Sequence, residues 1–132
     1  MNSYTGVIIE ESLENTDVLQ RVAITASQVE PVTDRHKTPW LSQWTLRWVE
    51  IPEAEAQAVA AELSRSLDRG HAGSWYADFR NDTHHFVIFR DKVFFVDRRS
   101  REQYQAAIRY GISLGIPEHQ LDFRPLVDES GA

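Results

Sequence analysis

The sequence lacks cysteine, and this absence excludes two kinds of site. With no thiol among its 132 residues, the chain forms neither disulfide bonds nor thiolate metal centres. A chain without cysteine fits a reducing compartment. The start, MNSYTGVIIEES, has no basic leader, and no run approaches the roughly 18 apolar residues of a membrane span. We therefore expect a protein of the cytoplasm with no membrane partner.

The sequence also lacks an excess of positive charge. Its formal net charge is −6, whereas a nucleic-acid-binding surface needs basic residues against the phosphates, so nucleic-acid binding is not expected. The segment from Arg90 to Arg109 is an exception, because it holds six basic and three acidic residues. A local basic region on an acidic protein predicts a small anion or an acidic protein as partner.

Alternating hydrophobicity predicts three strands in the first part of the chain. They are expected at Thr5–Ser12, Val18–Val29 and Gln43–Ile51. The second should pair with the first in antiparallel fashion. In the third, Trp44 and Trp48 also fit a helical spacing, but aromatic and branched residues dominate and Pro52 follows, which favours a strand. We expect both tryptophans, and Trp75, to pack on core faces rather than to stack on bases.

The clearest helix is expected at Pro52–Gly70, with proline in its first turn and glycine as a left-handed cap. Its apolar stripe comprises Ala56, Val59, Ala60, Leu63 and Leu67. Three short strands should follow, at Trp75–Arg80, His84–Arg90 and Val93–Asp97. A second helix is expected from Ser100, where Ser100-x-x-Gln103 forms a capping box. Its inner face comprises Tyr104, Ala107, Ile108 and Gly111.

This order of elements predicts an α+β fold. We expect a mainly antiparallel sheet of about six strands in the order βββαβββα, with two helices packed on the sheet. Residues 1–125 should form a single domain, and residues 126–132 a disordered acidic tail.

The segment NDTHHFVIF, from Asn81 to Phe89, raises the question of a metal site, because two histidines stand side by side. Asn81-Asp82 predicts a tight two-residue hairpin turn. That turn would place Asp78 opposite His85 across the strands. Adjacent residues of a strand point to opposite faces, so His84 and His85 should not share a metal ion. We therefore expect no metal site.

The same hairpin sorts the side chains onto two faces. The expected core face holds Trp75, Ala77, Phe79, Phe86, Ile88, Val93 and Phe95, with His84 at its end. The second face has an apolar end formed by Val87, Phe89, Phe94 and Val96. Either the second helix or another subunit must cover this end. We favour both helices on the core face and a homodimer through these four residues.

Asp78 and His85 are the sharpest catalytic candidates. A carboxylate beside an imidazole can orient it and raise its basicity, which is half of a general-base arrangement. Tyr76 and Arg80 flank the pair on the same face and are candidate ligand-binding residues. The alternative interpretation is an ordinary surface ion pair, worth at most about 1 kcal/mol.

Two further segments carry weaker candidate sites. Arg98 and Arg99 lie at the start of the second helix, where an anion could bind. The alternative is a solvated helix end whose arginines are neutralised locally. The loop Thr33–Trp40 combines charged residues with a tryptophan, which is typical of functional loops, but we favour a solvated connection with Trp40 packed into the core.

Several stretches together resemble a family of short bacterial proteins with no established function. They are YTGVIIEESL, HKTPWLSQWTL, VEIPE, WYADFRNDTHH and YGISLGIPEHQLDF, and the likeness extends to about residue 125. The resemblance implies a bacterial cytoplasmic protein and carries over no functional residue. We therefore expect a binding or interaction domain without a cofactor. The alternative is a small enzyme that uses Asp78 and His85 as a general base on an anionic substrate.

Overall fold

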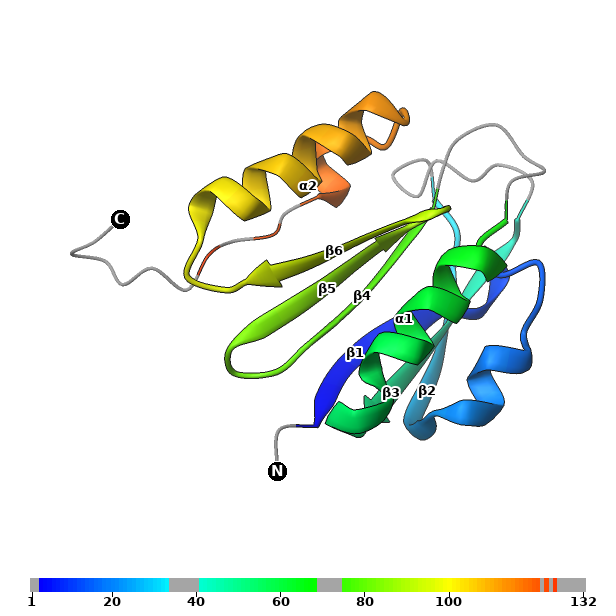
Figure 1. Ribbon diagram of the computed structural model, residues 1–132. Coiled ribbons are helices and arrows are strands. Elements are labelled where there is room, and N and C mark those ends of the chain that lie inside the picture. The colour runs from blue at the N-terminus through cyan, green and yellow to red at the C-terminus, as the bar shows by residue number, and fades with distance from the viewer. Residues whose placement is uncertain (1–2, 34–40, 69–74, 122, 124, 126–132) are drawn as a thin grey trace.

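The computed structural model describes residues 3–33, 41–68, 75–121, 123 and 125 (Figure 1). Six strands form one sheet in the order β2-β3-β1-β4-β5-β6, and each pair of neighbouring strands is antiparallel. The main elements are β1 (Tyr4–Ile9), β2 (Ala23–Pro31), β3 (Gln43–Ile51), α1 (Glu53–Ser66), β4 (Tyr76–Arg80), β5 (His84–Phe89), β6 (Lys92–Asp97) and α2 (Arg101–Ser113). Short 3₁₀ helices lie in the connections: η1 (Glu10–Ser12), η2 (Asp17–Arg21) and η4 (Glu118–Gln120). This architecture confirms the predicted α+β fold and its order of elements.

The pairing predicted for the second strand is wrong, because β3 lies between β1 and β2. The second strand starts at Ala23 instead of the expected Val18, because Asp17–Arg21 forms η2. A β-bulge then interrupts β2 between Ile24, which pairs with Val49, and Ala26, which pairs with Trp48. One extra residue reverses the alternation of side chains. Ile24 and Ala26 therefore point to opposite faces, although regular alternation along a strand would place both on the same face.

The β4–β5 turn lies one residue later than expected. Asn81 and His84 form its closing pair, since the Asn81 backbone N–H donates to the His84 carbonyl at 3.0 Å. The Asn81 side-chain oxygen accepts from the backbone N–H groups of Thr83 at 2.9 Å and His84 at 2.8 Å. The turn residues are thus Asp82 and Thr83, because the asparagine side chain caps the turn from its first position.

This turn displaces the register of β5 by two residues from the expected one. Asp78 lies opposite Val87 instead of His85. Because two is an even number, every side chain keeps the face that the sequence predicted. The His84 ring stacks on the Phe95 ring with their centroids 4.4 Å apart, whereas His85 points to the other face. The predicted divergence of the two imidazoles is therefore confirmed.

Helix α1 covers one face of the sheet, and its predicted apolar stripe is buried there. Ala56, Val59, Ala60, Leu63 and Leu67 pack with strand residues that include Ile8, Ile51, Phe79, Phe86 and Ile88. The helix ends at Ser66, and the glycine expected to cap it lies outside the described residues. Instead, Arg90 donates to the carbonyl oxygens of Arg65 and Leu67 at 2.9 and 2.5 Å, which satisfies two acceptors at the helix end.

Helix α2 packs on the opposite face, so the prediction of both helices on one face is wrong. Ser100 caps the helix by accepting from the Gln103 N–H at 3.1 Å. The second core combines strand residues with Tyr104, Ala107, Ile116 and Leu121. Within one chain it buries Val87, Phe89 and Val96 and half-buries Phe94, the residues expected to form a homodimer interface. A helix removes this apolar surface from water as a second subunit would. The homodimer stays a prediction.

The two helices leave part of the sheet uncovered, as Figure 1 shows, because α2 lies beside β5 and β6 and away from β2 and β3. On the face that carries α2, Val7 pairs with Trp48 and Ile9 pairs with Leu46. All four are half-buried, as is Trp44. The expectation that Trp48 lies in the core is therefore wrong. Trp75 is buried, and the half-buried Trp44 packs against the core that α1 covers, as expected.

A substitution at Gly6 tests the closest approach of two strands. Gly6 pairs with Phe79, and a Cβ atom at position 6 would lie 2.3 Å from the Asp78 carbonyl oxygen and 2.8 Å from the Phe79 Cα. Gly6→Ala should therefore force β1 and β4 apart and lower the free energy of unfolding by roughly 1–3 kcal/mol. Urea denaturation followed by tryptophan fluorescence measures this loss. Thr5→Val, at the exposed neighbouring position, is the control, and equal midpoints for all three proteins would refute the interpretation.

Candidate active site and ligand groove

A buried histidine connects two elements through both of its ring nitrogens. The His85 side chain on β5 is 5% exposed. Its Nε2 lies 2.7 Å from Oδ2 of Asp78 on β4, and its Nδ1 lies 2.9 Å from the Tyr104 hydroxyl on α2. Asp78 and His85 are diagonal neighbours on one sheet face, within reach of long side chains. The sequence-predicted pair is therefore in contact, with Tyr104 as a third member.

Asp78 determines the direction of this hydrogen-bonded chain. A carboxylate only accepts, so Nε2 of His85 carries a proton and donates to Oδ2 of Asp78. In the neutral imidazole, Nδ1 then accepts from the Tyr104 O–H. The Arg98 guanidinium lies near the phenol, and its Nη1 donates to the Asn81 carbonyl oxygen at 2.6 Å.

The surroundings keep the Tyr104 phenol protonated. Burial raises the pKa of Tyr104 above its ordinary value of 10.0, and the hydrogen bond and charge of Arg98 oppose this shift without reversing it. The ring of Phe123 packs edge-on against His85, with centroids 5.5 Å apart. Tyr104 is therefore a hydrogen-bond donor at neutral pH, and an aromatic ring borders the imidazole.

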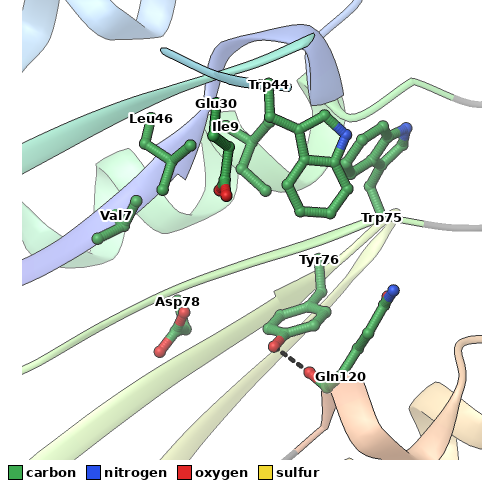
Figure 2. Close-up of a pocket in the computed structure, with 9 residues that line it drawn as sticks. All are labelled: Val7, Ile9, Glu30, Trp44, Leu46, Trp75, Tyr76, Asp78 and Gln120. Carbon is green, nitrogen blue, oxygen red and sulfur yellow. Dashed lines mark hydrogen bonds between the residues drawn. The ribbon is translucent and has the colours of Figure 1, made fainter. Parts of the chain in front are cut away.

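The far side of Asp78 opens into a groove of about 280 Å³ on the uncovered part of the sheet. The Asp78 side chain is 25% exposed. Figure 2 shows the groove with Asp78 and Val7 at one end and the two indole rings at the other. Its lining comes from β1, β2, β3 and β4, from the residue before β4 and from η4. The lining residues are Val7, Ile9, Glu30, Trp44, Leu46, Trp75, Tyr76, Asp78 and Gln120.

Aromatic side chains form much of the groove wall. The ring centroids of Trp44 and Trp75 lie 5.4 Å apart, which joins the start of β3 to the residue before β4. Tyr76 donates its hydroxyl proton to the Gln120 carbonyl oxygen, as the dashed line in Figure 2 marks. Its ring also contacts Phe123 at 5.3 Å. These contacts hold the wall between η4 and the sheet in one arrangement.

The structure separates the residues that the sequence analysis had grouped around His85. Asp78 and Tyr76 line the groove, whereas His85 lies behind Asp78 with both nitrogens engaged. Arg80 is exposed and pairs with His85 across the strands, but it does not line the groove. The geometry therefore favours Asp78, rather than His85, as the group that meets a ligand.

The two arginines predicted to bind an anion have different surroundings. Arg98 is half-buried, and its guanidinium donates to the Asn81 carbonyl oxygen. Arg99 is exposed, and its backbone N–H donates to Asp97 Oδ1 at 2.9 Å. Anion binding by Arg98 and Arg99 stays a prediction. The charged part of the other candidate loop, residues 34–40, lies outside the described residues.

Sequence reasoning missed Tyr104 and most of the groove. Tyr104 was expected only as an inner-face residue of the second helix. A buried phenol needs a hydrogen-bond partner. Once α2 is known to face the strand of His85, this requirement could have predicted the contact between Tyr104 and His85. Trp44, Leu46, Glu30 and Gln120 carry no such signal, because they come from segments far apart in the chain.

The described residues also bear on metal binding and on membrane-spanning helices. Over these residues, no group of three or more histidine, aspartate or glutamate side chains is placed to hold a metal ion. In the same part of the chain, neither α1 nor α2 nor any shorter helix has the length and apolar character needed to cross a membrane.

The tautomer of His85 can be measured directly. Long-range ¹H–¹⁵N spectra should show a protonated Nε2 and an unprotonated Nδ1, because the Asp78 carboxylate accepts from Nε2 and the Tyr104 O–H donates to Nδ1. Tyr104→Phe should leave Nδ1 buried without a donor and lower the free energy of unfolding by about 1–3 kcal/mol. Tyr110→Phe on the same helix is the control, since Tyr110 makes ring contacts with Phe89 and Phe94. A protonated Nδ1 in the wild-type protein would contradict the assigned direction.

Comparison with known proteins identifies no relative of this chain. No protein-family model matches it, and neither the search of curated proteins nor the search of solved structures returns a match.

Proposed function

We propose that this protein is a binding domain of the bacterial cytoplasm that works without a cofactor, and that its ligand site is the groove over β1, β3 and β4. The observation that carries the proposal is the position of Asp78. Its carboxylate stands in the wall of an apolar groove and is held from behind by His85. Ligand sites in proteins commonly combine apolar walls with a few fixed polar groups.

The composition of the groove supports this proposal. Val7, Ile9 and Leu46 are half-buried and would lose further contact with water when a ligand binds. The hydrogen bond from His85 orients Asp78 before binding, so a ligand need not order it. A volume of about 280 Å³ matches a small molecule more closely than a protein surface.

A neutral apolar probe tests whether the groove binds ligands. N-phenyl-1-naphthylamine should gain fluorescence with the wild-type protein, and Leu46→Gln should weaken its binding about fivefold through the loss of roughly 1 kcal/mol of apolar contact. Phe95→Gln is the control, because Phe95 is 54% exposed and lines a separate hollow between α1 and β6. Weakening by Phe95→Gln alone, or no probe binding at all, would count against the groove.

A second candidate function is a small enzyme in which the Asp78–His85 pair transfers protons. The buried chain from Tyr104 through His85 to Asp78 favours it, because a carboxylate hydrogen-bonded to an imidazole is a common acid–base arrangement. The sequence-based hypothesis made His85 the base and Asp78 its orienter. Since both His85 nitrogens are engaged, the candidate now has Asp78 as the base and His85 as its positioning residue. Arg80, exposed on the same face, would attract the anionic substrate.

The enzyme candidate can be tested with two chromogenic substrates. p-Nitrophenyl phosphate is anionic and p-nitrophenyl acetate is neutral, and an active protein should prefer the phosphate. Asp78→Asn should lower its turnover by about 10²–10⁴-fold, the usual contribution of a general acid or base. Asp91→Asn is the matched control, since Asp91 has φ 61° in the β5–β6 turn, which asparagine also adopts. Turnover no faster than in buffer, or unchanged by Asp78→Asn, would exclude this function.

A further inference from the structure

We infer that the groove selects small organic cations, in which an amidinium, guanidinium or ammonium group is attached to a flat apolar body. The inference rests on the proposed function and adds to it the charge of the ligand. It follows from three features of the groove, which are the sign of its charged side chains, the arrangement of its aromatic rings and the open side of Asp78.

The charged side chains that line the groove are carboxylates. Glu30 on β2 and Asp78 on β4 belong to the lining, and no lysine or arginine among the described residues does. Arg47 points to the α1 side, where it donates to Glu10 at 2.7 Å. Arg80 lies two residues from Asp78 at the exposed end of β4. The Asp78 carboxylate between apolar walls attracts a cation and repels an anion.

The aromatic rings of the groove also favour a cation. Trp44, Trp75 and Tyr76 line one end and one side of it. The face of an indole or phenol ring carries negative charge density and attracts an ammonium or guanidinium group. The same rings give a flat apolar body a surface on which to stack. A ligand with both parts would therefore use the carboxylate and the rings together.

Asp78 is prepared to accept hydrogen bonds from such a ligand. Its Oδ2 accepts from His85, and among the described residues no other group donates a hydrogen bond to this carboxylate. A carboxylate has about four acceptor positions, so several remain for donors from the groove. Amidinium and guanidinium groups present paired N–H donors that match a carboxylate. A neutral amide forms weaker bonds there, and a carboxylate ligand forms none.

The inference can be tested with three ligands of nearly one shape: benzamidine, benzamide and benzoate. Calorimetric titration of the full chain should give a dissociation constant for benzamidine on the order of tenfold lower than for benzamide, with benzoate the weakest. Asp78→Asn should abolish this preference and Asp91→Asn should retain it. Added salt should weaken benzamidine binding and leave benzamide unchanged.

The outcomes separate this inference from the proposed function. Benzamide or benzoate binding as tightly as benzamidine, while displacing N-phenyl-1-naphthylamine, would overturn the cation selectivity and leave the groove as a binding site. Failure of the neutral probe to bind would overturn the proposed function itself. If Asp78→Asn does not fold, the wild-type protein carries the test. Benzamidine should then shift the Asp78 carboxyl ¹³C resonance, and an unmoved resonance would overturn the inference.

Discussion

The pairing of β1 with β4 is the constraint on which the rest of the sheet depends. It joins the strands β2, β3 and β1 to the strands β4, β5 and β6. Gly6 permits it, because no Cβ atom fits between Gly6 and the backbone of Asp78 and Phe79. The same pairing sets Val7 beside Asp78, so one end of the groove forms where the two halves of the sheet meet.

Placing the helices on opposite faces gives each face of the sheet its own helix. Helix α1 buries the first core, while α2 buries Val87, Phe89 and Val96 on the other face. Because α2 stops short of β3, it leaves Leu46 and Trp48 half-buried. The open groove and the buried hydrogen-bonded chain are therefore neighbours, and Asp78 belongs to both. Tyr104 and His85 are buried with hydrogen-bond partners, as buried polar groups in proteins require.

Period-two alternation made much of the strand geometry predictable. The faces of β4, β5 and β6 agree with the expectation, although the turn was placed one residue early, because an even displacement preserves faces. The same reasoning failed on β2, where a bulge near Thr25 changes the count by one. It failed for the strand order too, since a pattern of apolar residues does not say which strand lies next to which. The contact of Asp78 with His85 survived as a diagonal one.

The sequence by itself determined the strands, the inner faces of both helices and the opposite directions of His84 and His85. These are local properties, which follow from the repeat of a strand or a helix. Only the tertiary structure decided that α2 covers Val87 and Phe89, that Tyr104 completes the chain behind Asp78, and that the aromatic groove stays open. The physical reason is that both sheet faces have apolar residues to bury, so the choice between them depends on packing among segments far apart in the chain.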